Sequence, residues 1–435
     1  MPTPTVGDDA DDFSPDREYA RDLDDADPLA DLRERFFVPE DERYMDGNSL
    51  GLCSEDAAAA LDQVVEEWKE LAIRGWTDAD PDWFHYGERL GDRIAPLVGA
   101  RESEVVVGNS TTVNIHTLVG TMLDAHDGET VLVNDLDFPT DHYAIAAQLR
   151  QRGLDPDEHL LRVESEDGRT ITADAVETAL ETHDVDIVFM PTVLYRSGQL
   201  LDVEAITELA HEHDALAGFD AAHSVGVVPH EFDEVGVDFA VWCTYKYLNA
   251  GPGAIAGLYV NERHFDAEPA LAGWWGHDKA TQFEMNHAFT PADDAGAWQI
   301  GTIPVLAAAP LDGALDVTHD AGIEALREKS VLLTDYLIRL ADERLVDLGY
   351  AVGTPRDPER RGGHVAIEHE EAYRISQALK ERGVVVDYRP PNVVRVAPSP
   401  YYVGFEEVWT VVEDLHDIAA NELFREYEPQ SGGVT

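Results

Sequence analysis

The chain has few basic residues and almost no cysteine. Only 31 lysine and arginine residues stand against 87 aspartate and glutamate residues, which gives the 435-residue chain a formal net charge of −56. An electrostatic field of this sign repels nucleic acid and anionic membranes, so we expect neither as a partner. Two cysteines, Cys53 and Cys243, cannot form a disulfide framework. Because Cys243 lies in an apolar run, we expect it to be a core residue.

Long apolar runs are also absent. No segment approaches the roughly 20 consecutive apolar residues of a membrane span, and the N-terminus is acidic where a secretory signal would be basic. We therefore expect a cytoplasmic protein. No metal site is expected, because His211 with His213 and His364 with His369 lack the cysteines or spaced carboxylates that would complete one. These histidines are instead expected at exposed ends of helices and strands.

The acidic residues are spread over the whole chain and coexist with 44% hydrophobic and 9% aromatic residues. This combination is typical of a globular protein and not of a disordered acidic one. We interpret the charge as an adaptation to a cytosol of high salt concentration, since the Debye length falls to about 3 Å at molar salt and screens the self-repulsion. A chain of this length is also long enough for two domains.

Short apolar runs that alternate with helical patterns predict the fold class. The runs expected to be strands lie at 105–107, 131–134, 187–190, 216–219, 235–243 and 254–260. Strands alternating with helices of this length indicate βαβ units and an α/β fold with a mostly parallel sheet flanked by helices. Further along, strands are expected near 364–368, 383–387 and 393–397, with helices near 371–382 and 405–422. These elements predict a smaller α+β C-terminal domain.

The same pattern predicts four segments. Residues 1–50 form an N-terminal segment that packs with the smaller domain, and residues 51–310 form the large α/β domain. The smaller domain covers residues 311–427, and residues 428–435 are expected to be a mobile polar tail.

Lysine is scarce, and one of the five lysines has an unusual setting. Lys246 stands in a Tyr-Lys-Tyr turn just beyond an apolar run. A poorly hydrated amine is a candidate nucleophile towards a carbonyl group, and a lysine that extends from a strand end into water is the alternative. The other lysines lie in acidic or polar segments and are expected to be solvated: Lys69, Lys279, Lys329 and Lys380.

A carboxylate follows the preceding predicted strand. The apolar run 216–219 ends at Asp220, and small residues and His223 come next. Side chains at the carboxyl ends of strands line the ligand crevice of α/β folds, so Asp220 and Lys246 are expected to face one ligand. Such a pair suits pyridoxal phosphate, whose aldehyde binds a lysine and whose pyridine nitrogen is kept protonated by a carboxylate. An aspartate that only caps a turn is the alternative.

A candidate anion site follows the first strand of the large domain. Residues 108–112, with Thr111 and Thr112, open a helix, where free N–H groups and the helix dipole attract anions. An ordinary helix cap is the alternative. The next strand is followed by Phe138 and Asp141, an aromatic ring and a carboxylate at a strand end.

Six short motifs identify a resemblance. They are YMDGNSLG at 44–51, FPTD at 138–141, GFDAAH at 218–223, YKYLN at 245–249, GWWGH at 273–277 and RVAP at 395–398. With them the chain resembles the kynureninase family over nearly its whole length. This resemblance implies the aspartate-aminotransferase-like fold (PLP fold type I) and pyridoxal phosphate (PLP, pyridoxal 5'-phosphate) as cofactor. The first and fifth motifs are far more specific than the aspartate and lysine motifs, which occur in many relatives.

The resemblance also implies roles for individual residues. Lys246 binds the cofactor and moves the α-proton of the substrate, Asp220 pairs with the pyridine nitrogen, and Arg395 binds the substrate carboxylate. Tyr245 is the candidate acid and base for later proton transfers, with a phosphate hydrogen bond alone as the alternative. The other implied cofactor contacts are Thr111, Thr112, Phe138, Asp141 and His223, with Trp274 and Thr302 from the partner subunit of a homodimer.

The implied reaction is hydrolysis of a carbon–carbon bond in a ketonic substrate. L-kynurenine gives anthranilate and L-alanine, a step of tryptophan catabolism and of NAD precursor supply. Ile303 replaces a common second proline, and Thr302 stands where some relatives carry asparagine near the aryl group, so 3-hydroxykynurenine stays open as the preferred substrate. Two further alternatives are a cysteine desulfurase or lyase of the same fold, which requires a mobile loop cysteine, and a PLP-binding protein without activity.

Overall fold

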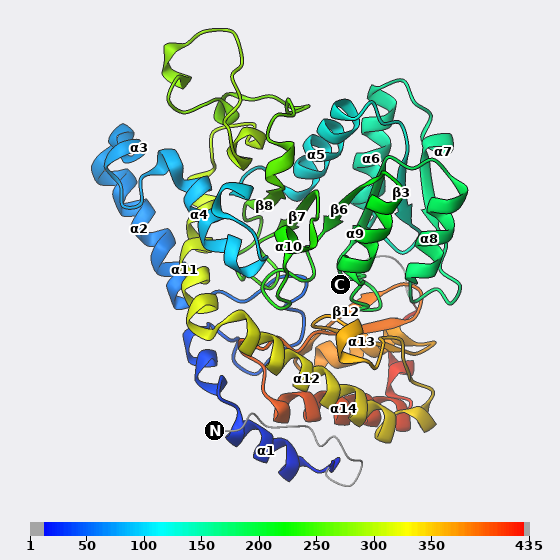
Figure 1. The fold of residues 1–435 in the computed structure, drawn as a ribbon. Helices are drawn as coiled ribbons and strands as arrows, with labels where there is room; N and C mark the ends of the chain where they lie inside the picture. The colour runs from blue at the N-terminus through cyan, green and yellow to red at the C-terminus, as the bar shows by residue number, and fades with distance from the viewer. Residues whose placement is uncertain (1–12, 430–435) are drawn as a thin grey trace.

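The computed structural model describes residues 13–429 and contains one large sheet, one small sheet and a two-stranded pair (Figure 1). The large sheet has seven strands in the order β2 (Val105–Val107), β8 (Ala256–Val260), β7 (Phe239–Cys243), β6 (Leu216–Asp220), β5 (Ile187–Pro191), β3 (Val131–Asn134) and β4 (Leu160–Val163). β8 runs antiparallel to the other six strands of this sheet, which are parallel to one another. The predicted α/β class with a mostly parallel sheet is therefore confirmed.

Both faces of the large sheet are buried, which explains its continuous apolar strands. Val131 and Val133 of β3 belong to the core on one face, whereas Leu132 between them belongs to the core on the other face. The covering helices are α5 (Thr111–Ala125) and α6 (Pro139–Gln151) on the first face, and α8 (Ala173–Thr182) and α9 (Val203–Glu212) on the second. Alternate residues of a strand thus serve two helical layers.

The predicted strand at 235–243 is wrong in its first half. A short helix, α10 (Phe232–Val235), precedes the strand and ends at Gly236, which adopts the left-handed conformation with φ 81°. Asp238 then turns inward and accepts a hydrogen bond from the Ala217 N–H, and β7 begins only at the next residue. The glycine and the aspartate that interrupt the apolar run are therefore part of a turn.

The smaller unit is built on an antiparallel sheet in the order β12 (Asp387–Arg389), β13 (Val393–Val396), β10 (Val365–Glu368) and β9 (Ala351–Val352). Its helices are α12 (Ile323–Arg344), α13 (Ala372–Glu381) and α14 (Phe405–Ala420), and α1 (Arg17–Ala26) packs on α14. Nearby, β1 (Arg43–Tyr44) pairs in parallel with β11 (Val384–Val385). These elements confirm the predicted α+β unit.

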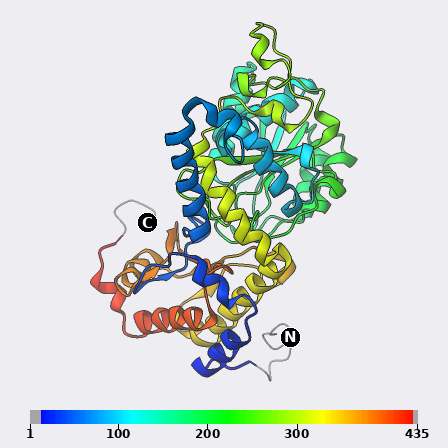
Figure 2. The ribbon, with the colours of Figure 1, turned by 90° about the vertical axis from the view of Figure 1, so that its left-hand side faces the viewer.

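Two long helices connect the sheets. Figure 2 shows α2 (Glu55–Leu71) and α11 (Val305–Ala321) side by side. The approach is close at Gly313, where an added Cβ would lie 2.1 Å from the Asp56 carbonyl oxygen. The predicted boundary at residue 310 falls inside α11, and the domain limits stay a prediction. The predicted tail lies outside the described residues beyond position 429.

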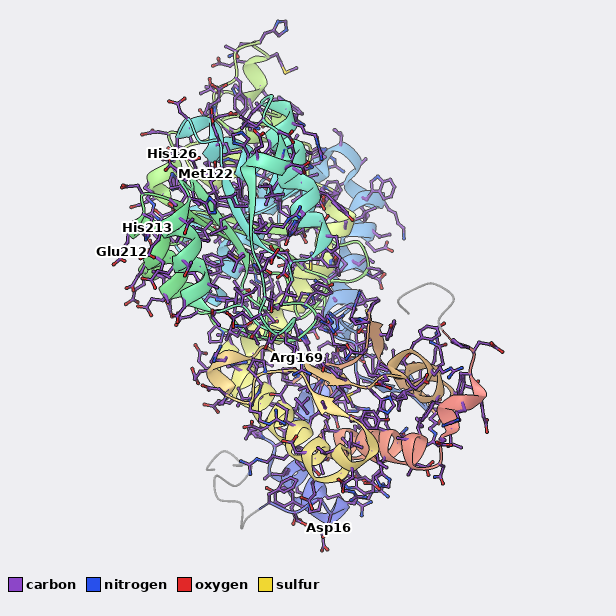
Figure 3. All side chains as sticks on the ribbon, turned by 90° about the vertical axis from the view of Figure 1, so that its right-hand side faces the viewer. Asp16, Met122, His126, Arg169, Glu212 and His213 are labelled. Carbon is purple, nitrogen blue, oxygen red and sulfur yellow. The ribbon has the colours of Figure 1, made fainter. Side chains whose placement is uncertain are left out.

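Side chains from the two units meet at a narrow junction, where Figure 3 shows Arg169. Its guanidinium lies 2.5 Å from the carboxylate of Glu368 on β10. Arg196, in the loop after β5, donates to Asn392 over 2.7 Å. The smaller unit therefore contacts the loops that follow the strands of the large sheet.

Three expectations about surface residues are wrong. Lys329 is only 6% exposed, and its Nζ lies 2.7 Å from the Asp27 carboxylate. Lys279 keeps 17% of its side chain exposed, and its Nζ lies 2.8 Å from the Glu88 carboxylate. His364 is fully buried instead of lying at an exposed strand end. All three residues contact distant segments of the chain, so local polarity predicts the wrong exposure. Cys243 is buried, as predicted. Within residues 13–429, no helix is long and apolar enough to cross a membrane.

Candidate active site

Lys246 and Asp220 lie at the same edge of the large sheet. Asp220 is the last residue of β6, and Lys246 lies three residues beyond the end of the parallel neighbour β7. Lys246 Nζ lies 2.9 Å from His223 Nε2, and Asp220 accepts a hydrogen bond from the Ala222 N–H over 2.8 Å. Burial raises the pKa of Asp220, while the Lys246 charge and the Ala222 N–H oppose that shift. The structure thus brings these predicted residues together.

A second carboxylate, Asp141, shares this site. It lies in the first turn of α6 and is fully buried, and its carboxyl group interacts with that of Asp220. Burial raises its pKa well above the usual range, and the negative charges of Asp220 and Asp137 raise it further. Two neighbouring carboxyl groups cannot both ionise easily, so a protonated Asp141 beside an ionised Asp220 is the favoured state.

The start of α5 is the predicted anion site. Thr111 is its first residue, and Ser110 makes no capping hydrogen bond through its side chain, so the first-turn amides are available to a ligand. Thr112 Oγ1 lies 3.1 Å from Thr140 Oγ1 at the start of α6. Phe138, just before α6, is partly exposed and makes an edge contact with Tyr195. A phosphate and an aromatic ring can therefore be held side by side.

Tyr245 precedes the candidate lysine and is half-buried. Burial raises the pKa of its phenol, and the Cys243 side chain next to it has the same effect. Its carbonyl oxygen accepts from the Gly51 N–H over 2.8 Å. A phenol in this environment keeps its proton at neutral pH, which is the state required of a proton donor.

Arg395 reaches the site from β13 of the smaller sheet and is 1% exposed. Its Nε and Nη2 donate to the two oxygens of Asp387 over 3.0 and 2.5 Å. Nη2 also donates to Ser49 Oγ and Nη1 donates to the Tyr195 carbonyl, each over 2.7 Å. Burial lowers the pKa of Arg395, and the Asp387 carboxylate opposes that shift. The guanidinium is thus fixed in one orientation by three segments.

Two buried histidines lie between the lysine and the arginine. The rings of His223 and His364 are 5.6 Å apart, and burial lowers both pKa values well below the usual range. The charges of Lys246 and Arg395 lower both values further. His223 Nδ1 has no hydrogen-bond partner, and the ring nitrogens of His364 make no hydrogen bond of good geometry, although the Tyr195 carbonyl acts on that ring. Neutral imidazoles with free nitrogens are available to a ligand here.

Trp274 and Thr302 do not join this group. Trp274 is 47% exposed and contacts Trp275 and Phe283, in the segment that extends at the upper left of Figure 1. An added Cβ at Gly273 would lie 1.9 Å from the Ile300 carbonyl oxygen. The loop that carries Trp274 therefore packs directly against the loop that carries Thr302. Within residues 13–429, no hydrogen bond, ion pair or ring contact links Trp274 or Thr302 to Lys246.

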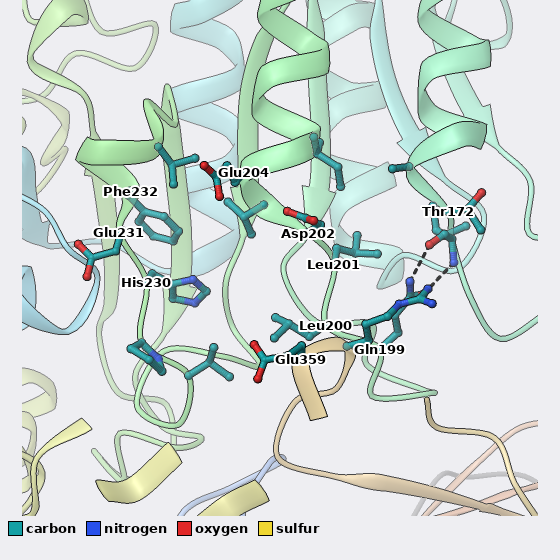
Figure 4. Close-up of a pocket in the computed structure, with 18 residues that line it drawn as sticks. Thr172, Gln199, Leu200, Leu201, Asp202, Glu204, His230, Glu231, Phe232 and Glu359 are labelled. Carbon is teal, nitrogen blue, oxygen red and sulfur yellow. Dashed lines mark hydrogen bonds between the residues drawn. The ribbon is translucent and has the colours of Figure 1, made fainter. Parts of the chain in front are cut away.

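A cavity of about 590 Å³ is lined by residues other than the predicted site residues (Figure 4). His230 in its wall has Nε2 2.7 Å from Ser224 Oγ, and that oxygen lies 2.7 Å from Thr192 Oγ1. The Thr192 N–H donates to the carbonyl of Asp220 over 2.9 Å. This wall therefore supports the strand end that carries Asp220, and the predicted site residues are not among those that line the cavity.

Sequence reasoning missed Asp387 and Tyr195 and misplaced His364. Asp387 is directly opposite Arg395 in the register of β12 and β13. A charged residue in each of two neighbouring apolar runs was an available signal for this pair. Nothing local marks Tyr195, because its contribution is a backbone carbonyl.

Comparisons with known proteins place this geometry in a class. The family model described as aminotransferase class I and II matches residues 48–248. A cysteine desulfurase structure from Thermococcus onnurineus NA1 has a TM-score of 0.77 at 18% identity and covers 90% of this chain and 98% of its own. A C-DES structure with glycine linked covalently to a PLP cofactor also has a TM-score of 0.77 at 18% identity, with 88% and 99% coverage. The protein has the fold of the PLP-dependent aminotransferase-like enzymes.

More similar sequences define the family. The model described as kynureninase C-terminal domain matches residues 326–415. Kynureninase from Geobacillus thermodenitrificans is 48% identical over 416 residues, 95% of this chain and 97% of that protein. Kynureninase from Bacillus thuringiensis is 49% identical over 417 residues, 96% and 97% of the two chains. The chain belongs to the kynureninase family of enzymes, as the sequence motifs predicted.

Proposed function

We propose that this enzyme binds PLP at Lys246 and hydrolyses L-kynurenine to anthranilate and L-alanine. The observation that carries the proposal is the convergence of an amine from the large sheet and a fixed guanidinium from the small sheet around two neutral histidines. An amine can bind the cofactor, and a guanidinium suits the carboxylate of an amino acid. The alignment with kynureninases over nearly the whole chain supports this choice of substrate.

The residues present fit PLP. Asp220 is the anion that we assign to the pyridine nitrogen. The protonated Asp141 can donate a hydrogen bond to the Asp220 carboxylate. The first turn of α5, with Thr111 and Thr112, suits the phosphate, and Phe138 offers a ring to stack on. When bound, PLP supplies a protonated ring that withdraws electrons from the α-carbon of the substrate.

The chain supplies proton transfer and orientation. Lys246 Nζ takes the α-proton of the substrate, with His223 2.9 Å away to keep the amine in place. Arg395 fixes the substrate carboxylate, so that the α-carbon faces the lysine. Water must add to the γ-carbonyl before the bond between the β- and γ-carbons breaks. Tyr245, a phenol that keeps its proton, is the group we assign to the later proton transfers.

The proposed assembly is a homodimer with shared sites. No hydrogen bond, ion pair or ring contact within residues 13–429 links Trp274 or Thr302 to Lys246, which supports their action on the site of a partner subunit. Phe283 and Met285 in the same segment are exposed apolar residues, 65% and 68%, of the kind an interface covers. We also propose that the enzyme acts in the cytoplasm and requires high salt, which the net charge of −56 supports.

The decisive test is anthranilate fluorescence from purified enzyme with PLP and L-kynurenine, in molar potassium chloride and in dilute buffer. Release only in high salt supports both the reaction and the interpretation of the charge. The Lys246→Ala variant is expected to release none. Without release in either buffer, the proposed substrate is wrong, and 3-hydroxykynurenine, followed by desulfurase substrates, would be tested next.

A further inference from the structure

The donors of Arg395 are nearly all used within the protein. A guanidinium has five N–H donors. Those on Nε and Nη2 go to Asp387 and Ser49, and one on Nη1 goes to the Tyr195 carbonyl. One donor on Nη1 is left for a ligand. A carboxylate has two oxygens and about four acceptor positions, so this arginine alone satisfies only part of it.

His364 is placed to supply another donor. It directly precedes β10, the neighbour of β13, which carries Arg395. The residue is 0% exposed, and neither ring nitrogen makes a hydrogen bond of good geometry, although the Tyr195 carbonyl, which accepts from Arg395 Nη1, also acts on the ring. Leaving a buried polar group unpaired costs about 1–3 kcal/mol, so such a group calls for a partner that binds from outside.

The surroundings of His364 point to an anion as that partner. The charged groups that act on its ring are Arg395, Lys246 and Arg389, all of them positive. On the other side the ring lies against Gly198, where an added Cβ would be 3.3 Å from Nε2. A neutral imidazole can donate to a carboxylate here without adding another positive charge. Burial, which keeps the pKa of His364 low, maintains that neutral state.

We propose that His364 donates a hydrogen bond to the α-carboxylate of the substrate, beside the single free N–H of Arg395. The inference rests on the proposed function, because it assumes an amino-acid substrate whose carboxylate is bound at Arg395. It makes His364 a substrate-binding residue from the smaller sheet. Carboxylate recognition then requires both β13 and the segment before β10.

Two uncleavable ligands test this in the holoenzyme. 2-Amino-4-phenylbutanoate has the carboxylate but no γ-carbonyl, and 3-phenylpropylamine lacks both. In calorimetric titrations, His364→Phe should weaken binding of the amino acid at least tenfold, equal to about 1.4 kcal/mol, and leave binding of the amine within about threefold. His364→Gln keeps a neutral N–H donor and should retain most of the preference for the carboxylate. His369→Phe, at the other end of β10, is the matched control and should bind both ligands as the parent enzyme does.

Equal losses for the two ligands, or no loss in His364→Phe, would overturn the inference, as would a parent enzyme that binds neither. If His364→Phe does not fold, the glutamine variant decides, since a tenfold loss of the carboxylate preference contradicts a donor role. With L-kynurenine, KM should rise in His364→Phe while kcat changes less than about threefold. The titrations contain no cleavable substrate, so they remain informative if anthranilate is never released and the proposed reaction is wrong.

Discussion

Replacing Asp387 with asparagine should destabilise the smaller sheet strongly. The Asp387 carboxylate is fully buried and accepts from Arg395 through both oxygens, while Arg389 Nη2 lies 2.5 Å from one of them. Asparagine has a similar shape but no charge, so two guanidinium groups would lose the carboxylate between them and keep only neutral acceptors: the amide oxygen, Ser49 Oγ and the Tyr195 carbonyl. Breaking a buried pair by removing one partner costs about 3–5 kcal/mol.

We expect a value near the lower end, about 3 kcal/mol, because the asparagine oxygen still accepts one hydrogen bond. The control is Asp414→Asn, which removes the same charge from a more exposed pair, 2.9 Å from Arg382, where Asp417 remains as a second partner. That change should cost about 0–1 kcal/mol. Both variants lower the net negative charge equally, so general self-repulsion cancels between them.

The measurement is urea unfolding in molar potassium chloride, followed by tryptophan fluorescence for the parent and both variants. Adding Arg395→Gln to Asp387→Asn should recover part of the loss, since the stranded charge is removed. A loss below about 1 kcal/mol in Asp387→Asn, equal to that in the control, would show that the pair contributes no more than a surface ion pair.

Two carboxylates should give opposite pH dependences. Burial, followed by the charge of Asp387, raises the pKa of Asp46 from 3.8 to about 6, so its deprotonation costs folding stability as pH rises between these values. The free energy of unfolding of Asp46→Asn, taken from urea titrations, should therefore gain up to about 3 kcal/mol on that of the parent between pH 4 and pH 8, and a constant difference would contradict this. Burial acts to raise the pKa of Asp238, but hydrogen bonds from His211 and His264 and the Ala217 N–H lower it overall. Asp238→Asn should cost about 2–4 kcal/mol at pH 7 and less below pH 4, where the parent loses this contribution; an equal cost at pH 3 and pH 7 would refute the assignment.

Much of the large sheet could be predicted because its strands are buried on both faces and read as apolar runs. The run 187–190 and strand β5 agree within one residue. β4 (Leu160–Val163) was not predicted, because this edge strand has Arg162 among its four residues and acidic neighbours. The start of β7 was misjudged because the apolar character continues through a turn.

The site was predictable where residues belong to motifs and unpredictable where distant segments meet. Lys246, Asp220 and His223 follow two strands that are adjacent in the sheet, and the rule about strand ends places them together. The burial of His364 depends on a loop near Gly198, more than 160 positions earlier in the chain. Local sequence carries no sign of such a contact, and the assignments of cofactor and substrate contacts stay predictions.

The turn at residues 46–51 connects the two halves of the site. Ser49 accepts a hydrogen bond from Arg395, 346 positions later in the chain, and Gly51 donates to Tyr245. During synthesis on a ribosome, the lysine loop therefore emerges well before the strand that completes the carboxylate site. If Arg395 binds the substrate carboxylate as proposed, a chain that stops before this residue lacks part of its substrate site even where the segments of the large sheet have been made. The proposed activity then requires that translation has passed almost to its end.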